Sequence, residues 1–583
     1  MRLLFLHPED VPWHGLWAQQ RWDLIVDLGF ASTYAYEEWG GRLGTRVLSI
    51  HQFAGQTEGY RWVNQVLERG RHRLLDRIGL DWWEILTMEC YQDLQAGFLF
   101  DRLRTEIATD QIELAASRPH RWARIAEQTL SHPVRYFENS GEGSIRRVTR
   151  ALRSARNLRG AQIAEIVADK WDAGYKLRRR WVKHEIARLE HPALLLPSAY
   201  SNVTRSTLAY ATQLPNRKFL LVTTRRSAVP ARPPANVTVS PLAAYVRPTK
   251  AMEEEVAELK DAWQAFLGAM MEEHEEFRSP ANAGVWDYFP VHLERGIHLR
   301  EAWKQVLDSE PVTGVLCGDD LNYSTRLPLM LARRRGLNAV YCSHGALDGG
   351  FLFKMPVADS YLVKGEMESD YLQRIAAIRP ETIAVAAPGS SNFSTGSDQH
   401  RDAVVFFSQP YEVAGGRTDS FYRELLPRLC AVARRSGRRV VIKLHPFESR
   451  RARQSLVSSI LPRDIQCSVE LVDGMPLEEV MARAWCGLTV DSSVAVECAL
   501  RKIPFFLCGW LDFMGMGYLQ QFARFGIAHI LNSPEEIEQI PERVAAYQFA
   551  PATLARLWHA ADPTELDEIM FGTREARLAR CAS

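Results

Sequence analysis

The chain of 583 residues is longer than one hydrophobic core usually serves, and 46% of it is hydrophobic, so two or three domains are expected. Its 71 Lys and Arg residues nearly balance 70 Asp and Glu residues, and a net charge of +1 provides no global field for binding nucleic acid. The nine cysteines form no C-x-x-C pair, and no apolar run approaches the ~20 residues of a membrane span. These features predict a cytoplasmic protein without a disulfide framework or a zinc site.

Short β-rich runs open the chain. Residues 2–6, 23–28 and 46–50 are separated by turn-forming or helical stretches, which is the rhythm of a parallel sheet. From about 57 to 190 long amphipathic segments follow with almost no strand signal, which predicts a helical insertion. The sheet rhythm then resumes, so we predict one Rossmann-like domain over 1–390 that carries this insertion. The later strand signals lie at 193–196, 219–222, 314–317 and 339–342.

The predicted insertion contains a run of arginines at spacings of three and four residues, which places most of them on one helical face. Such a face can meet anionic lipid, and peripheral contact with the inner membrane is therefore one expectation. The alternative is a face that is only solvated or paired with carboxylates. The residues are Arg146, Arg147, Arg150, Arg153, Arg156 and Arg159.

A second series of strands and helices begins after the linker at 388–391. Its regular alternation predicts a doubly wound α/β domain over 391–545. A helical tail over 546–583 is expected to cross back to the first domain. The predicted strands lie at 403–407, 440–444, 469–472, 487–490 and 503–507.

Polar residues follow three of these strands: a Gln-Pro pair, a Lys-Leu-His-Pro run and an Asp-Ser-Ser turn that leads into a helix. Open α/β sheets bind ligands beyond the carboxyl ends of their strands, where helix N-termini offer unpaired N–H groups. An ammonium, an imidazole and two hydroxyls there would suit a nucleotide phosphate. Taken singly, each group has a plainer explanation as an edge lysine, a core histidine or a helix cap. The candidate nucleotide-binding residues are Gln409, Pro410, Lys443, His445, Pro446, Ser492, Ser493 and Glu497.

The pairs Gln409-Pro410, His445-Pro446 and Ser492-Ser493 resemble the QP, HP and serine-pair motifs of bacterial surface-polysaccharide glycosyltransferases that use CMP-sugars, namely capsule Kdo transferases and bacterial sialyltransferases. The resemblance covers about residues 310–510. It implies a GT-B fold, in which two Rossmann-like doubly wound domains face a cleft. It also implies an inverting transferase in which His445 contacts the CMP phosphate and the serines hold that phosphate as it leaves.

The reaction implied by this resemblance needs neither a cofactor nor a metal. The donor would be a nucleotide-sugar of the CMP-Kdo or CMP-sialic-acid kind, and the acceptor a surface glycan or a lipid-linked molecule of capsule or lipopolysaccharide synthesis. A base for the acceptor hydroxyl would come from the first domain. We rank His344 and Asp348 above Asp319 and Asp320, because a strand-end histidine followed by glycine lets a sugar approach closely, whereas the acidic pair is expected to cap a helix.

Trp13 and His14 follow the first predicted strand and are candidates for binding acceptor sugars, since aromatic faces stack on sugar rings. The alternative is that the tryptophans near this position only cover the helical insertion.

Two other functions fit the same pattern. A UDP-sugar transferase or a UDP-sugar 2-epimerase would also use paired Rossmann-like domains, although an epimerase needs no large acceptor platform. A non-catalytic scaffold of polysaccharide assembly would keep the sugar-nucleotide site and tolerate loss of the base.

Overall fold

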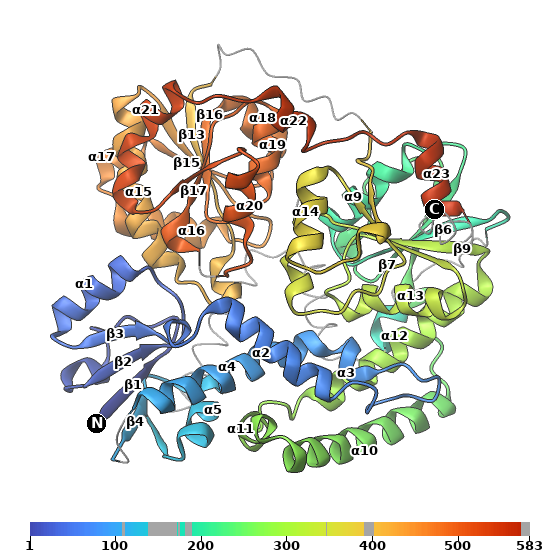
Figure 1. Ribbon diagram of the computed structural model, residues 1–583, viewed down its shortest axis with the longest axis horizontal. Helices are drawn as coiled ribbons and strands as arrows, with labels where there is room; N and C mark the ends of the chain where they lie inside the picture. The colour runs from blue at the N-terminus through green and yellow to red at the C-terminus, as the bar shows by residue number, and fades with distance from the viewer. Residues whose placement is uncertain are drawn as a thin grey trace. The chain divides into compact units, whose positions relative to one another are not determined.

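The computed structural model describes residues 1–107, 111–137, 172, 175–180, 189–345, 347–389, 401–512 and 514–572. The chain forms two compact units, each built from separate stretches of sequence (Figure 1). Unit 1 comprises residues 1–58, 99–140 and 392–557, and unit 2 comprises residues 59–98, 141–391 and 558–583. The predicted arginine face at 146–159 lies outside the described residues.

A five-stranded parallel sheet forms the N-terminal part of unit 1, in the order β3-β2-β1-β4-β5. Its central strands are buried on both faces; Leu3, Leu4 and Phe5 are all 0% exposed. The strands are β1 (Arg2–Leu6), β2 (Leu24–Asp27), β3 (Arg46–Ser49), β4 (Glu113–Ala116) and β5 (Val134–Tyr136). The helices of this region are α1 (Thr33–Leu43) and α5 (Arg121–Leu130), together with α4 (Thr87–Glu106), which begins in unit 2.

Two predictions about the first 390 residues are wrong. The stretch expected to be a helical insertion contains β4 and β5, and the N-terminal strands form their own sheet instead of joining the later one. Strand β4 reads Glu-Leu-Ala-Ala, without a β-branched residue or alternation, and β5 reads Val-Arg-Tyr, which is too short for its pattern to be recognised. Which distant strands pair is decided by tertiary packing, which local periodicity does not report.

The second sheet of unit 1 has six parallel strands in the order β15-β14-β13-β16-β17-β18, as a doubly wound domain requires. Helices cover both faces, with α15, α17 and α21 on one side and α18, α19 and α20 on the other (Figure 1). The prediction of an α/β fold built on parallel sheets is confirmed. The strands are β13 (Ala403–Phe407), β14 (Arg439–Lys443), β15 (Val469–Val472), β16 (Ala484–Thr489), β17 (Phe505–Cys508) and β18 (His529–Leu531). The helices are α15 (Thr418–Arg435), α16 (Arg450–Ile460), α17 (Arg463–Gln466), α18 (Leu477–Arg483), α19 (Val494–Leu500), α20 (Tyr518–Arg524), α21 (Ile540–Ala545) and α22 (Pro551–Ala555).

A buried ion pair joins the two sheets of unit 1. Arg417, immediately before α15, donates to both carboxylate oxygens of Asp27 at the end of β2, at 2.6 and 2.7 Å, and both residues are at most 2% exposed. The same guanidinium donates to the backbone oxygens of His7 and Asp10. Removing one partner of such a pair leaves an uncompensated buried charge, which costs about 3–5 kcal/mol.

Unit 2 contains a seven-stranded parallel sheet in the order β12-β11-β10-β9-β6-β7-β8. The strands are β6 (Ala193–Ser198), β7 (Lys218–Thr223), β8 (Val237–Pro241), β9 (Val312–Cys317), β10 (Asn338–Cys342), β11 (Ser360–Val363) and β12 (Ile383–Val385). The helices are α2 (Gln56–Arg69), α3 (Trp82–Ile85), α8 (Lys176–Arg180), α9 (Ser201–Ala211), α10 (Lys250–Glu273), α11 (Arg278–Asn282), α12 (Phe289–Ser309), α13 (Tyr323–Arg334), α14 (Glu366–Arg374) and α23 (Pro563–Phe571).

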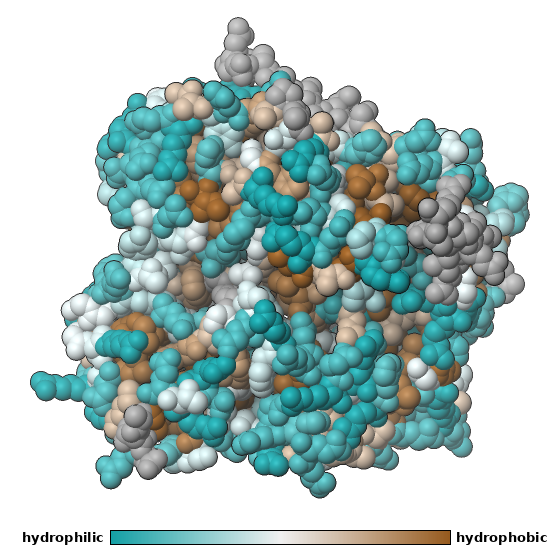
Figure 2. All heavy atoms as spheres, viewed as in Figure 1, coloured by the Kyte–Doolittle hydropathy of each residue, from teal (hydrophilic) through white to brown (hydrophobic). Residues whose placement is uncertain are grey.

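The long helix α10 packs its apolar stripe, including Trp263 and Phe266, against the rest of unit 2. Its outer surface is hydrophilic (Figure 2), as expected for an acidic amphipathic helix. The tail helix α23 also belongs to unit 2, where Leu566 and Met570 are fully buried in the core of the seven-stranded sheet. Among the described helices, none is long and apolar enough to cross a membrane.

Candidate functional site

The six-stranded sheet changes direction next to its first strand. After β13 the chain adds β14 and β15 on one side, and then crosses back to place β16 on the other side of β13. Open α/β sheets bind ligands at this kind of position, where neighbouring crossovers diverge and leave a crevice beyond the strand ends. Gln409 follows β13, His445 follows β14, and Ser492 and Ser493 follow β16. The predicted residues therefore lie at the ends of three adjacent strands around the crossover.

His445 is half-buried, and its ring orientation is fixed by the loop that follows it. The backbone N–H of Phe447 donates to Nδ1 of His445 at 3.2 Å, so the proton of the neutral ring lies on Nε2, which has no hydrogen-bond partner among the described residues. Burial lowers the pKa of His445, and Lys443 acts in the same direction against the opposing effect of Glu448. Near pH 7 the imidazole is a neutral N–H donor.

Lys443 ends β14 and is also half-buried. Its ammonium donates to the backbone oxygen of Leu444 at 3.0 Å, and burial lowers its pKa. Pro446, which was predicted with the nucleotide-binding group, is exposed in the loop beside Phe447.

The carboxylate of Glu448 connects the ends of β13 and β14, a role not predicted from the sequence. Its side chain is fully buried and accepts from the backbone N–H of His445 at 2.7 Å, from the hydroxyl of Ser408 at 2.8 Å and from Nε of Arg453 at 2.6 Å. Glu448 thereby sets the position from which His445 projects. The only sequence signal for this role was that Glu448 follows His445 by three residues.

Ser492 and Ser493 lie between β16 and α19, and both are half-buried. The Ser492 hydroxyl accepts from the backbone N–H of Val494 at 3.4 Å, and Ser493 precedes α19 without a side-chain cap bond. Glu497 lies in the first turn of α19 and is half-buried. Because β13 separates β14 from β16, His445 and the serines stand on strands whose axes are about 10 Å apart. No hydrogen bond joins the imidazole to either hydroxyl within the described chain.

A second group of polar side chains occupies the same strand ends. The Gln409 amide donates to the carboxylate of Asp491, and burial together with Asp512 raises the pKa of Asp491 to about 7. Oε1 of Gln409 and the hydroxyl of Tyr411 are buried without a hydrogen-bond partner among the described residues. Buried polar atoms are nearly always paired, so these two are groups that the fold leaves uncommitted. The sequence analysis predicted no separate role for Asp491, which appeared there only as the first residue of the Asp-Ser-Ser turn.

Asp348, in unit 2, is held in a buried ion pair. Its carboxylate accepts from Lys354 at 2.7 Å, from the hydroxyl of Tyr341 and from the backbone N–H of Gly350 at 3.0 Å. Burial would raise the pKa of Asp348, but the Lys354 ammonium outweighs it and lowers the pKa overall. A carboxylate with its oxygens occupied and its pKa lowered is a poor general base.

His344 is exposed after β10, and its Nδ1 lies 3.0 Å from the backbone oxygen of Gly318. Because a carbonyl only accepts, Nδ1 carries the proton of the neutral ring and Nε2 keeps a lone pair, as a general base requires. Asp319 and Asp320 do not cap α13 as expected, since its N-cap is Asn322. Asp320 instead pairs with Lys354 and with Arg326, and Asp319 accepts from the backbone N–H of Leu321.

Trp13 and His14 belong to unit 1, beside the five-stranded sheet. Trp13 is half-buried against Trp39, with ring centroids 5.9 Å apart, and the Arg42 guanidinium lies 4.1 Å from its ring centroid. One face of this indole is therefore occupied within the protein. His14 is exposed.

No group of three or more His, Cys, Asp or Glu side chains suited to holding a metal ion occurs among the described residues. No protein-family model matches the chain, and no curated protein matches its sequence.

Several solved structures are distantly similar. A glycosyltransferase of kitacinnamycin shares 12% identity over 68% of this chain and 100% of its own, with a TM-score of 0.39. The UDP-GlcNAc 2-epimerase from Neisseria meningitidis, bound to UDP-GlcNAc, shares 11% over 67% and 99%, with a TM-score of 0.37. The wall teichoic acid polymerase TagF shares 10% over 75% and 98%, with a TM-score of 0.36. These scores are too low to assign a fold family or an activity to this chain.

Proposed function

We propose that the protein is an inverting glycosyltransferase of the GT-B type whose sugar-nucleotide donor binds at the crossover between β13 and β16. One observation carries the proposal: the ends of β14, β13 and β16 bring an imidazole N–H, a buried amide oxygen and two serine hydroxyls around one switch point, and the first two have no partner among the described residues. The QP, HP and serine-pair motifs at these same positions support a CMP-sugar of the Kdo or sialic acid kind as the donor.

The chemistry follows from the protonation states. The Nε2–H of His445, the Lys443 ammonium and the serine hydroxyls would stabilise the negative charge that develops on the departing phosphate oxygen. Nε2 of His344 would accept the proton of the acceptor hydroxyl as its oxygen bonds to the anomeric carbon. The bond from that carbon to the phosphate oxygen breaks at the same time, and its electron pair stays on the phosphate. The acceptor would be a surface glycan or a lipid-linked molecule.

The experiment is hydrolysis and transfer measured with a panel of CMP-sugars and UDP-sugars. We expect turnover of a CMP-sugar by the wild-type chain and a loss of about 100-fold or more in His445→Ala. The matched control is His529→Ala, in the edge strand β18 of the same sheet, which should keep full turnover. Turnover of UDP-sugars alone would replace the CMP assignment, and binding without turnover of any donor would favour a non-catalytic scaffold.

The proposed base has its own test. His344→Ala should bind the nucleotide as tightly as the wild type but lose transfer. Unchanged transfer in this variant would reject His344 as the base.

A further inference from the structure

The loop that carries His344 follows one strand of unit 2, and Lys364 follows the neighbouring strand. Strands β10 and β11 are parallel, and their register pairs Cys342 with Leu362. Ser343 and His344 come directly after β10, and Lys364 comes directly after β11. Because the carboxyl ends of parallel strands meet at the same edge of a sheet, Lys364 lies beside the loop.

The ammonium of Lys364 holds the backbone on both sides of His344. Its Nζ donates to the backbone oxygen of Ser343 at 3.1 Å and to that of Gly345 at 2.5 Å. It also donates to the carboxylate of Glu368 at 3.3 Å. An ammonium has three N–H donors, so these three acceptors leave none for a substrate. Lys364 therefore acts on the loop and not on a ligand.

Lys364 is itself fixed by its surroundings. Its side chain is 16% exposed, and that of Glu368 on α14 is 5% exposed. The carboxylate of Glu368 also accepts from the backbone N–H of Lys364 at 2.8 Å. The backbone oxygen of Lys364 accepts from the backbone N–H of His559, in the segment before α23, at 2.8 Å. A lysine bonded through both its backbone and its ammonium holds the loop in one position.

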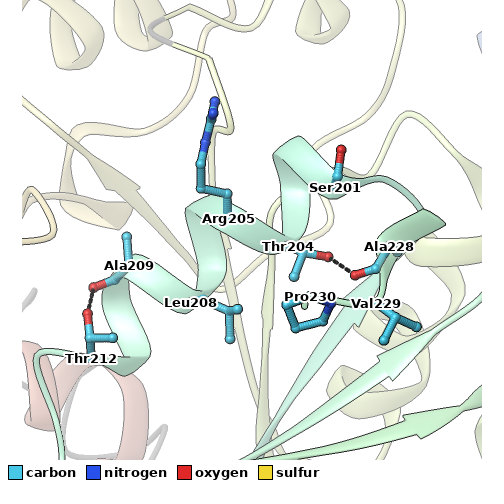
Figure 3. A pocket seen from close by; sticks show the side chains of 9 residues that line it. All are labelled: Ser201, Thr204, Arg205, Leu208, Ala209, Thr212, Ala228, Val229 and Pro230. Atoms are coloured by element: carbon cyan, nitrogen blue, oxygen red, sulfur yellow. Dashed lines mark hydrogen bonds between the residues drawn. The ribbon is translucent and has the colours of Figure 1, made fainter. Parts of the chain in front are cut away.

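The ring of His344 is held as well as its backbone. Nδ1 donates to the backbone oxygen of Gly318, and the Ser206 hydroxyl on α9 lies 3.5 Å from the backbone oxygen of His344. The apolar groove along α9 is a separate feature, because its described lining includes no residue of this loop. Figure 3 shows Arg205, which lines that groove, extending from α9 away from Leu208.

We propose that Lys364 is a positioning residue for His344: its ammonium holds the backbone oxygens of the residues before and after this histidine, and so keeps Nε2 in place to accept the proton of the acceptor hydroxyl. This inference rests on the proposed role of His344 as the base. A misplacement of about 1 Å can cost an enzyme about 100-fold in rate, so loss of this ammonium should have a measurable effect. A purely structural lysine would change stability but not the rate per folded molecule.

The test compares steady-state transfer by the full chain in the wild type, Lys364→Met and Lys260→Met. We expect Lys364→Met to lose about 10-fold or more in kcat, with an unchanged KM for the nucleotide-sugar, because the proposed donor site belongs to unit 1. The matched control Lys260→Met removes an ammonium of unit 2 that pairs with Glu294 on α12 at 2.7 Å, and it should transfer like the wild type. An unchanged kcat in folded Lys364→Met would overturn the proposal.

A second variant decides the question if Lys364→Met fails to fold. Lys364→Met combined with Glu368→Gln removes both charges, and the glutamine oxygen still accepts from the backbone N–H of residue 364. It should show the same loss in kcat. Adding both changes to His344→Ala should cause no further loss, because Lys364 acts through His344. A further loss of about 10-fold in that background would show that Lys364 acts elsewhere, and would overturn the proposal.

A measurement on the ring separates this inference from the proposed function, because it needs no turnover. In ¹⁵N spectra of histidine-labelled protein, the His344 ring should be protonated at Nδ1 in the wild type and exchange between both tautomers in Lys364→Met/Glu368→Gln. The spectrum of His344→Ala identifies the signal. A ring that keeps the Nδ1–H form in the variant would overturn the inference, even if His344→Ala abolishes transfer. A ring released in the variant of a protein that transfers no sugar would support the role of Lys364 and reject the proposed function.

Discussion

The two sheets of unit 1 share one topology but use their strand ends differently. Each has its first strand near the centre and crosses over beside it, between β1 and β4 in one sheet and between β13 and β16 in the other. Each also places a histidine after a strand whose Nδ1 accepts from the backbone N–H two residues later, at 3.2 Å in both His120 and His445. The same local arrangement is therefore available at both switch points.

The difference lies in what the neighbouring groups contact. At the five-stranded sheet, Asp27 is paired with Arg417, Asp10 is paired with Arg118, and the Ser117 hydroxyl accepts from the backbone N–H of His7. Among the described residues, the buried polar groups without a partner are the indole N–H groups of Trp17 and Trp122 at the five-stranded sheet, and Oε1 of Gln409 with the Tyr411 hydroxyl at the six-stranded sheet. The two switch points therefore differ in which groups the fold leaves uncommitted: indole N–H groups at the first, and an amide oxygen with a hydroxyl at the second.

The largest expected effect is on stability at the five-stranded sheet. Arg417→Met leaves Asp27 as an unpaired buried charge, so we expect a loss of about 3–5 kcal/mol in the free energy of unfolding, measured by urea denaturation. Arg417→Met combined with Asp27→Leu should recover most of this loss, because both charges are then gone. If Arg417→Met alone had the same free energy of unfolding as the wild type, the ion pair would not be what holds the two sheets together.

The next effect is on activity at the six-stranded sheet. The double variant Ser492→Ala/Ser493→Ala removes the hydroxyls proposed to stabilise the departing phosphate, so donor hydrolysis should fall by about 100-fold with little change in melting temperature. The control is Ser458→Ala with Ser459→Ala, on α16 of the same unit. Unchanged hydrolysis by the Ser492→Ala/Ser493→Ala variant would show that these serines do not take part in donor hydrolysis.

How far the sequence could predict the site depends on what each residue contacts. The strands at 403–407 and 440–444 were predicted closely, because buried parallel strands are continuous apolar runs, and the residues that follow them lie at the expected strand ends. Asp348 was predicted as a candidate base, but its partner Lys354 is set by the turn between them, which the sequence pattern does not show. Glu448 was missed because its importance comes from three contacts that form only in the folded loop.

A smaller effect is expected on the pH dependence of stability. The pKa of Asp491 is raised to about 7 by burial and Asp512, so the folded state binds its proton more tightly than the unfolded chain does. Stability is therefore lost as the pH rises from the ordinary carboxyl range through 7. Asp491→Asn should remove this loss and melt a few degrees above the wild type at pH 8, with a smaller difference at pH 5. Parallel melting curves for the two proteins across this range would contradict the assignment.

The smallest effect is expected at His120, which lies at the five-stranded sheet and has a structural role. The ring of His120 caps α5, and burial lowers its pKa to about 3. Loss of a helix cap costs about 1 kcal/mol, so His120→Ala should be slightly less stable and fully active in donor hydrolysis. Reduced hydrolysis would mean that the five-stranded sheet also contributes to donor binding.

The most direct measurement is calorimetric titration of CMP into the wild type, His445→Ala and His120→Ala. These histidines share burial, local hydrogen bonding and a lowered pKa, and differ in the sheet to which they belong. A hydrogen bond to a charged phosphate contributes about 1.5–3 kcal/mol, so we predict that His445→Ala weakens CMP binding at least 10-fold while His120→Ala leaves it unchanged. Equal affinity in all three proteins, or a loss in His120→Ala alone, would contradict the placement of the nucleotide site on the six-stranded sheet.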